Sequence, residues 1–197
     1  KNEAISYEEL AKNSDHIVKD LPKRSLFALY FYPSIDCISA YLGAIRNNHT
    51  ALLIDPLLDK ELKEKLFNKF KISIIFNGRN WLETSYKQSY SNKNLTILLS
   101  TSGSTGSPKL IKLSKRNLIS NAASIVEYMG LNQSDKAISS LPLHYSYGLS
   151  VLNSHLAVGA KFFLTDLPVT NKNFWSYFKL HGISGLAGVP ATWRILR

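Results

Sequence analysis

Residues 101–109 read Thr-Ser-Gly-Ser-Thr-Gly-Ser-Pro-Lys, and this stretch comes one residue after the apolar run Leu95–Leu99. Gly103 and Gly106 lack a Cβ, so their N–H groups can turn inward and approach an anion closely. The hydroxyl-bearing residues of the stretch add hydrogen-bond donors, and Lys109 adds a positive charge. The stretch therefore predicts a phosphate-binding loop at the end of a β-strand.

Other interpretations of the loop fit the sequence less well. A flexible Gly/Ser linker has a similar composition, but the alternating pattern that resumes at Leu110–Leu113 favours a second strand. A Walker A loop needs a Gly-Lys pair followed by Ser or Thr, whereas Pro108 precedes Lys109 here. A dinucleotide fingerprint needs Gly-x-Gly-x-x-Gly, and only one Gly-x-x-Gly is present. Both of these motifs are excluded.

Outward from the loop, apolar strands and amphipathic helices alternate along the chain. The predicted strands are residues 26–31, 51–54, 72–76, 96–100, 110–113, 136–140, 161–165 and 183–189. The predicted helices are residues 7–19, 35–46, 59–70, 115–129, 149–158 and 171–180. This alternation predicts an α/β fold of layered, parallel-rich sheets with helices on both faces. The polar segment at 85–94 is the best candidate for an internal boundary within one continuous domain over residues 1–197.

Residues 101–109 resemble, position by position, the phosphate loop of the adenylate-forming (AMP-binding) superfamily, whose pattern is [ST]-[SG]-G-[ST]-[ST]-G-x-P-K. Acyl-CoA synthetases and the adenylation domains of peptide synthetases belong to this superfamily. The chain departs from the pattern at Leu110, where the family most often has Gly. The resemblance implies that the ATP phosphates are bound by Thr101, Ser102, Gly103, Ser104, Thr105, Gly106 and Lys109.

Three further segments resemble the same family. Residues 32–56 resemble its segment of strand, helix start and second strand, and residues 141–149 resemble the motif Pro-x-x-His-x-x-Gly that lines the acyl pocket. When Pro142 and Gly148 are aligned with the Pro and the Gly of that motif, Tyr145 falls at the usual histidine position, and His144 lies one residue before it. Residues 188–192 resemble the Val-Pro segment of that pocket. The substrate-pocket residues that the resemblance implies are His144, Tyr145, Tyr147, Gly148, Val189 and Pro190.

The resemblance implies ATP- and Mg²⁺-dependent activation of a carboxylic acid to an acyl-adenylate, followed by transfer to coenzyme A or to a carrier's phosphopantetheine. It covers the N-terminal part of the family's fold, since the sequence ends at Arg197, before the family's magnesium glutamate, ribose aspartate and lid lysine. Catalytic residues are therefore expected beyond Arg197, and residues 1–197 alone are expected to be inactive and to self-associate. Two alternatives remain: a non-catalytic nucleotide-binding scaffold derived from this fold, and an unrelated α/β protein with a Ser/Gly loop.

Composition limits the other classes of protein. The 197 residues are 45% hydrophobic and carry a net charge of +10, but lysines alternate with glutamates on predicted helices and no nucleic-acid-binding motif accompanies them. We therefore expect no nucleic-acid partner. No apolar stretch is long enough to span a membrane and no secretory signal opens the sequence, which favours a cytoplasmic protein. Cys37 is alone and lies in an apolar pattern, so we expect a buried structural thiol; no His or Cys spacing predicts a metal site besides ATP-borne Mg²⁺.

Overall fold

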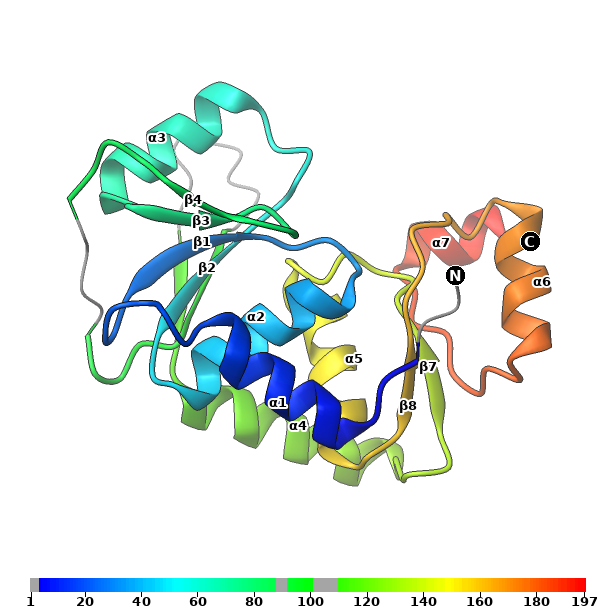
Figure 1. Cartoon of the computed structure of the whole chain (residues 1–197). Coiled ribbons are helices and arrows are strands. Elements are labelled where there is room, and N and C mark those ends of the chain that lie inside the picture. The colour runs from blue at the N-terminus through cyan, green and yellow to red at the C-terminus, as the bar shows by residue number, and fades with distance from the viewer. Residues whose placement is uncertain (1–3, 88–91, 101–109) are drawn as a thin grey trace. The chain divides into compact units, whose positions relative to one another are not determined.

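The computed structural model describes residues 4–87, 92–100 and 110–197, and the chain forms two compact units, residues 1–115 and 116–197 (Figure 1). The first unit contains a six-stranded sheet in the order β4-β3-β1-β2-β5-β6, and the second contains a two-stranded sheet, β7-β8. The strands of the first unit are β1 (Leu26–Tyr30), β2 (Thr50–Ile54), β3 (Ile74–Phe76), β4 (Trp81–Glu83), β5 (Ile97–Ser100) and β6 (Leu110–Leu113).

Four strands of the large sheet run parallel to one another. β1 pairs with β2 and β3, and β2 pairs with β5, all in parallel. The two edge strands are antiparallel to their neighbours, β4 to β3 and β6 to β5. These pairings confirm the predicted parallel-rich α/β fold. Its central strands are nearly continuous apolar runs, and such strands need helices on both faces of the sheet.

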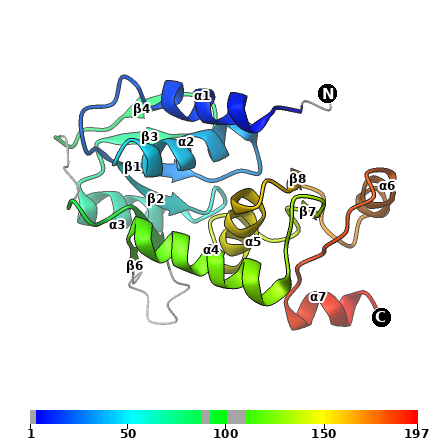
Figure 2. The ribbon, with the colours of Figure 1, turned by 90° about the horizontal axis from the view of Figure 1, so that it is seen from below.

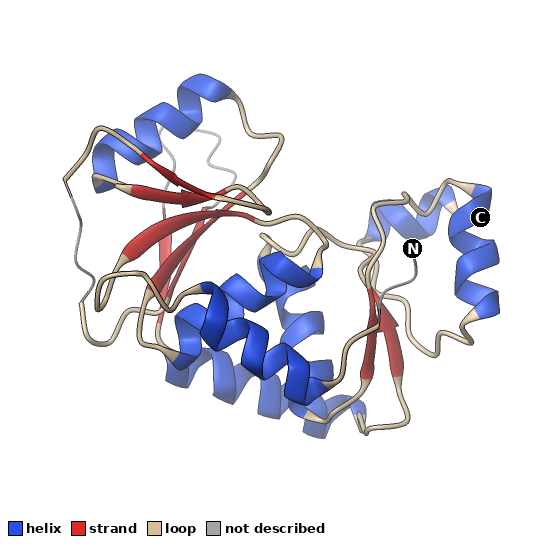
Figure 3. Ribbon diagram, viewed as in Figure 1, coloured by secondary structure: helices blue, strands red, loops and turns tan. Residues whose placement is uncertain are grey.

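Helices cover both faces of this sheet, as predicted. Helices α1 (Tyr7–Ile17) and α2 (Ile35–Arg46) lie on one face and α3 (Lys60–Phe70) lies on the other (Figure 3). Side chains alternate between the faces along each strand, so one set of apolar residues packs on α3. This buried cluster consists of Leu26, Ala28, Leu52, Ile54, Leu66, Phe67, Ile72, Ile75 and Leu98.

Local sequence explains where these helices begin. Ser6 and Glu9 form a capping box at the start of α1: the Ser6 side chain accepts a bond from the Glu9 N–H, and the Glu9 carboxylate accepts one from the Ser6 N–H. The Ser34 hydroxyl accepts a bond from the Cys37 N–H at 3.2 Å and caps α2. Asp59 caps α3 in the same way.

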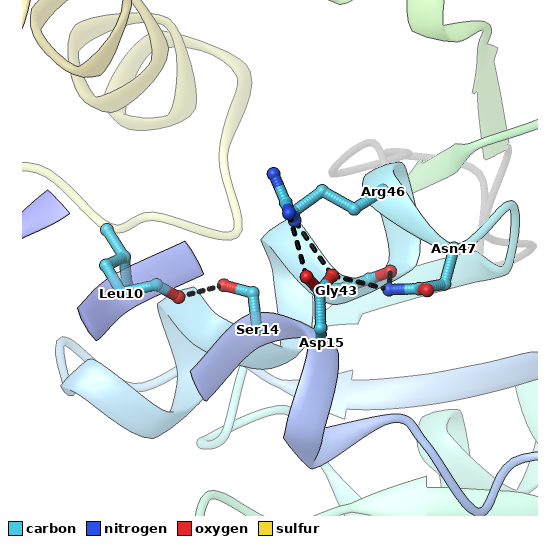
Figure 4. Close-up of polar contacts among 6 residues, drawn as sticks. All are labelled: Leu10, Ser14, Asp15, Gly43, Arg46 and Asn47. Carbon is cyan, nitrogen blue, oxygen red and sulfur yellow. Dashed lines mark hydrogen bonds and ion pairs between the residues drawn. The ribbon is translucent and has the colours of Figure 1, made fainter. Parts of the chain in front are cut away.

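Helices α1 and α2 pack unusually closely. A Cβ built at Gly43 would overlap the Ser14 carbonyl oxygen and lie 2.9 Å from a methyl carbon of Val18, so only glycine permits this approach. Beside this contact, both carboxylate oxygens of Asp15 accept bonds from the Arg46 guanidinium at 2.8 Å (Figure 4). Asn47 donates a further bond to Asp15 at 3.0 Å.

In the second unit, helices α4 and α5 lie side by side and the two short strands pair in parallel (Figure 2). The Ser150 hydroxyl of α5 donates to the Asn121 side chain of α4 at 3.1 Å. A smaller apolar cluster forms around Ile138, Phe174 and Ile183. The elements are α4 (Lys115–Met129), β7 (Lys136–Ile138), α5 (Ser146–Ala157), β8 (Lys161–Phe163), α6 (Lys172–Leu180) and α7 (Pro190–Ile195).

The structure corrects several predicted elements. The strand predicted over 183–189 does not form; a single bridge joins Gly185 to Ala137. Glycines at 182, 185 and 188 weaken a strand, and Gly182 has a positive φ of 59°. Helix α5 begins at Ser146, three residues before the predicted start, and β4 and α7 were not predicted. Pro190 at the first position of α7 suits a helix start, because its missing N–H would have no helical partner there.

Candidate nucleotide and substrate site

The predicted phosphate loop follows the carboxyl edge of the large sheet. Strands β1, β2, β3 and β5 are parallel, so their carboxyl ends share one edge, and β5 ends there at Ser100. In open α/β sheets, ligands bind outside the carboxyl ends of the strands. Residues 101–109, which include every predicted phosphate-binding residue, lie outside the described residues, so those assignments stay a prediction.

The two strands that flank the loop pair with each other. Ser100 is paired with Leu110 in the antiparallel register of β5 and β6, so both ends of the loop are anchored in neighbouring strands. Leu110 is partly buried and packs against the apolar cluster beneath α3. This packing gives a physical reason for leucine at the position where the family most often has glycine.

The second predicted motif, residues 142–148, folds back on itself at the start of α5. The Tyr145 N–H donates to the Pro142 carbonyl at 3.2 Å, and the Leu149 N–H donates to the Tyr145 carbonyl at 2.9 Å. A Cβ at Gly148 would overlap the Pro142 carbonyl oxygen, so glycine is needed for this turn. Gly148 thus has a packing role, whatever its contact with a substrate.

The aromatic residues of this motif differ in exposure. Tyr145 is 43% exposed and Tyr147 is 47% exposed, whereas His144 is partly buried. The His144 and Tyr145 rings meet edge to face with centroids 6.1 Å apart. Both tyrosines therefore present aromatic surface and a hydroxyl to whatever lies against this part of the second unit.

The third predicted segment, around Val189 and Pro190, lies next to the second. The Ser140 hydroxyl donates to the Ala187 carbonyl at 2.7 Å, and Leu141, Gly148 and Ala187 line one small crevice. The structure thus brings together the two segments that carry all the predicted substrate-pocket residues. Val189 itself is 41% exposed and stands at the N-cap position of α7, where its side chain makes no capping hydrogen bond.

Two residues of this region were missed by the sequence analysis. Ser140 joins the two segments, and the Trp193 indole N–H donates to the Gly188 carbonyl at 3.1 Å, which fixes the start of α7. A Cβ at Gly188 would lie 3.1 Å from both Thr192 and Trp193, so the turn is tight. The one sequence signal for Ser140 is that it is a polar residue at the end of the strand predicted over 136–140.

The surroundings of Cys37 and His49 indicate that these two residues have structural roles. Cys37 is buried, its thiol donates to the Tyr30 carbonyl at 3.2 Å, and burial raises its pKa, as expected for a structural thiol rather than a nucleophile. His49 is buried and its Nδ1 accepts a bond from the Ser25 N–H at 3.2 Å. Across the described ranges, no three His, Cys, Asp or Glu side chains gather as a metal site, and no helix is long and apolar enough to cross a membrane.

Comparison with known proteins defines the class to which this fold and these motifs belong. The family model of the AMP-binding enzymes matches residues 78–197, which include both predicted motifs and the Val-Pro segment. The chain therefore belongs to the AMP-binding enzyme family. The resemblance of residues 101–109 to this family is confirmed at that level.

Individual relatives agree with the family. The chain is 31% identical over 94 residues to sulfoacetate–CoA ligase of Cupriavidus necator, a match that covers 48% of this chain and 18% of the ligase. It is 24% identical over 181 residues to D-alanine–D-alanyl carrier protein ligase of Listeria welshimeri, covering 76% of this chain and 35% of that protein.

Solved structures show the same fold. The structure of o-succinylbenzoate CoA synthetase (MenE) from Bacillus subtilis with its acyl-adenylate intermediate superposes with a TM-score of 0.82 at 16% identity, covering 100% of this chain and 58% of that one. The structure of the same enzyme with ATP and a magnesium ion superposes on this chain with a TM-score of 0.81. The chain thus spans less than two thirds of the length of each of these relatives.

Proposed function

We propose that this protein, when complete, activates a carboxylic acid with ATP and passes the acyl group to a thiol. A carboxylate oxygen of the acid attacks the α-phosphorus of ATP, the bond to the β-phosphate oxygen breaks, and pyrophosphate leaves. The acyl-adenylate then reacts with a thiol, which forms a thioester and releases AMP. The observation that carries the proposal is the nine-position loop after β5, in a chain that belongs to the AMP-binding enzymes.

The loop would act electrostatically. Charge moves onto the departing pyrophosphate as the reaction proceeds, and fixed N–H groups, hydroxyls and a lysine ammonium stabilise it most strongly in the transition state. Residues 101–106 and Lys109 supply these groups in the proposal, and Mg²⁺ would accompany the ATP phosphates. Solved complexes of the structural neighbour o-succinylbenzoate CoA synthetase with ATP and magnesium support this choice of cofactors.

The acid would lie against the second unit. Tyr145 and Tyr147 are exposed aromatic residues, and Val189 and Pro190 lie on the segment that Ser140 joins to them. We propose that Tyr145, rather than His144, contacts the acyl group, because Tyr145 is the more exposed of the two side chains. The relatives include a CoA ligase and a carrier protein ligase, which supports coenzyme A or a carrier protein as the acceptor.

The loop assignment is tested with Lys109→Ala in the intact protein. Removal of one charge-assisted contact made mainly in the transition state should lower carboxylate-dependent exchange of pyrophosphate into ATP by roughly 10²- to 10³-fold, by analogy with loss of an oxyanion donor. Lys112→Ala is the matched control, since Lys112 is an exposed lysine on β6 and lies outside the loop. Unchanged exchange in a well-folded Lys109→Ala protein would refute the assignment, and absence of exchange in the unmodified protein would favour a non-catalytic scaffold.

A further inference from the structure

Ser140 lies where the two segments of the proposed acid pocket meet. It follows the end of β7 by two residues, and its hydroxyl donates to the Ala187 carbonyl at 2.7 Å. Pro142, which opens the substrate motif, comes two positions after Ser140, and Val189 comes two positions after Ala187. The bond therefore joins the two segments close to the residues that are proposed to contact the acid.

The first segment is a rigid turn over residues 142–148, called here the Tyr145 turn. The Tyr145 N–H donates to the Pro142 carbonyl at 3.2 Å, and Gly148 packs so closely on the same carbonyl that a Cβ would overlap it. These contacts fix the backbone that carries Tyr145. A displacement of this backbone at Ser140 would move the whole turn.

The second segment is also rigid, over residues 188–193, called here the Val189 turn. The Trp193 indole N–H donates to the Gly188 carbonyl at 3.1 Å, and the Trp193 N–H donates to the Val189 carbonyl at 3.3 Å. Pro190 has a fixed φ and occupies the first turn of α7. Val189 and Pro190 are thus held in place relative to α7.

Backbone pairing contributes little to holding the Val189 turn beside the Tyr145 turn. Gly185 forms a single bridge with Ala137, and in the described part of the chain residues 186–189 belong to no strand. A strand at this place would form a ladder of hydrogen bonds with β7. The bond from the Ser140 hydroxyl to Ala187 extends the attachment where the backbone pairing stops.

The preceding residue, Ser139, makes its hydrogen bonds to a different segment. Its hydroxyl donates to the Thr165 carbonyl at 3.0 Å and accepts a bond from the Thr165 N–H at 2.8 Å. Ser139 therefore attaches the end of β7 to the residues that follow β8, whereas Ser140 attaches it to the Val189 turn. The two serines differ in the segment that they hold.

From these contacts we propose that Ser140 is a positioning residue that sets the specificity for the acid. Its hydroxyl fixes the Tyr145 turn relative to the Val189 turn, which are two walls of one pocket in the function proposed above, and the inference rests on that function. Without the hydroxyl, the two walls can shift relative to each other. Displacements of about 1 Å are enough to impair the alignment of a bound substrate, so acids should be discriminated less well.

The specificity role is tested with Ser140→Ala in the intact protein, by carboxylate-dependent exchange of pyrophosphate into ATP. The KM for the preferred acid should rise by roughly three- to tenfold, the equivalent of one hydrogen bond. The preference among a panel of acids should narrow, and the KM for ATP should stay the same. Ser140→Thr keeps a hydroxyl and should retain the acid preference.

Ser139→Ala is the matched control. It removes a neighbouring hydroxyl with two hydrogen bonds to Thr165, so it should lower the free energy of unfolding without changing the preference among acids. An equal change of acid preference in Ser139→Ala and Ser140→Ala would overturn the proposal, because general loosening of β7 would then be the cause.

A second measurement needs no catalysis. Amide hydrogen exchange over residues 183–190, followed by mass spectrometry, should be faster in Ser140→Ala than in the unmodified protein and unaltered in Ser139→Ala. Thermal unfolding of each variant shows that it is folded. Unaltered hydrogen exchange in folded Ser140→Ala would refute the positioning role, and faster hydrogen exchange with an unchanged acid preference would refute the specificity role. Absence of pyrophosphate exchange in the unmodified protein would refute the proposed function and the specificity role with it, and hydrogen exchange would still decide whether Ser140 positions the Val189 turn.

Discussion

At the scale of single residues, the substrate motif is the part of the candidate site that the structure describes best. The sequence placed Tyr145 at the position of the family's histidine, and the structure shows Tyr145 exposed and His144 partly buried. Tyr145→Ala should therefore change the acid preference or the KM for the acid, whereas His144→Ala should have a mild effect. Pyrophosphate exchange with a panel of carboxylic acids measures both. A changed acid profile for His144→Ala with an unchanged profile for Tyr145→Ala would show that the motif is aligned one residue out of register.

His49 makes folding stability depend on pH. Burial lowers its pKa below the ordinary 6.5, and the neutral ring accepts a bond from the Ser25 N–H through Nδ1. The unfolded chain then binds more protons between the folded pKa and 6.5, so stability falls as pH drops below about 6.5. The free energy of unfolding in urea, measured from pH 7.5 to 5, should show this slope. His49→Asn, which removes the titrating ring, should flatten it.

At the scale of helices and strands, the sequence-based predictions are most accurate where one local interaction fixes the start of an element. The predicted starts of α1 and α2, at residues 7 and 35, are correct, and each is fixed by an N-cap, Ser6 or Ser34, whose side chain bonds a backbone N–H three residues further on. Strand β4 has three residues and is fixed by its pairing with β3, a tertiary contact that periodicity over so short a segment does not reveal. The strand predicted over 183–189 fails because its glycines leave too few side chains to pack.

The contact between α1 and α2 is a prediction at the same scale. Gly43→Ala would place a methyl group against the Ser14 carbonyl and Val18, so the helices must move apart. Although alanine is the better helix former, overpacking should dominate and lower the free energy of unfolding by roughly 1–3 kcal/mol. Urea unfolding measures the change. Gly185→Ala is the control, because a Cβ there meets no atom within 4 Å. Equal destabilisation by both substitutions would show that the close approach is not the cause.

At the scale of the whole molecule, the chain holds groups that act together with others. It spans 58% of the solved chain of o-succinylbenzoate CoA synthetase. In the function proposed above, its residues would bind the phosphates and line one side of the acid pocket. Positioned groups contribute to catalysis as a unit, and loss of several removes most of the rate that they supply jointly. The proposed nucleotide-binding contribution of residues 101–109 rests on sequence alone, whereas the packing within each of the two units rests on burial that the structure describes. Residues 1–197 produced by themselves should therefore fold without catalysing the proposed reaction.

We predict that residues 1–197 fold as an α/β protein but form no detectable acyl-adenylate. Both apolar clusters lie within these residues, so secondary structure and cooperative unfolding should persist. Exposed apolar side chains such as Ile119, Met129 and Leu180 should favour self-association, which sedimentation would detect as a rise in mass with concentration. Incubation with ATP, Mg²⁺ and a panel of carboxylic acids, followed by mass spectrometry for the adenylate, tests the chemistry, with the intact protein as positive control. Steady turnover by residues 1–197 would mean that the catalytic groups lie within them and that the proposed division of roles is wrong.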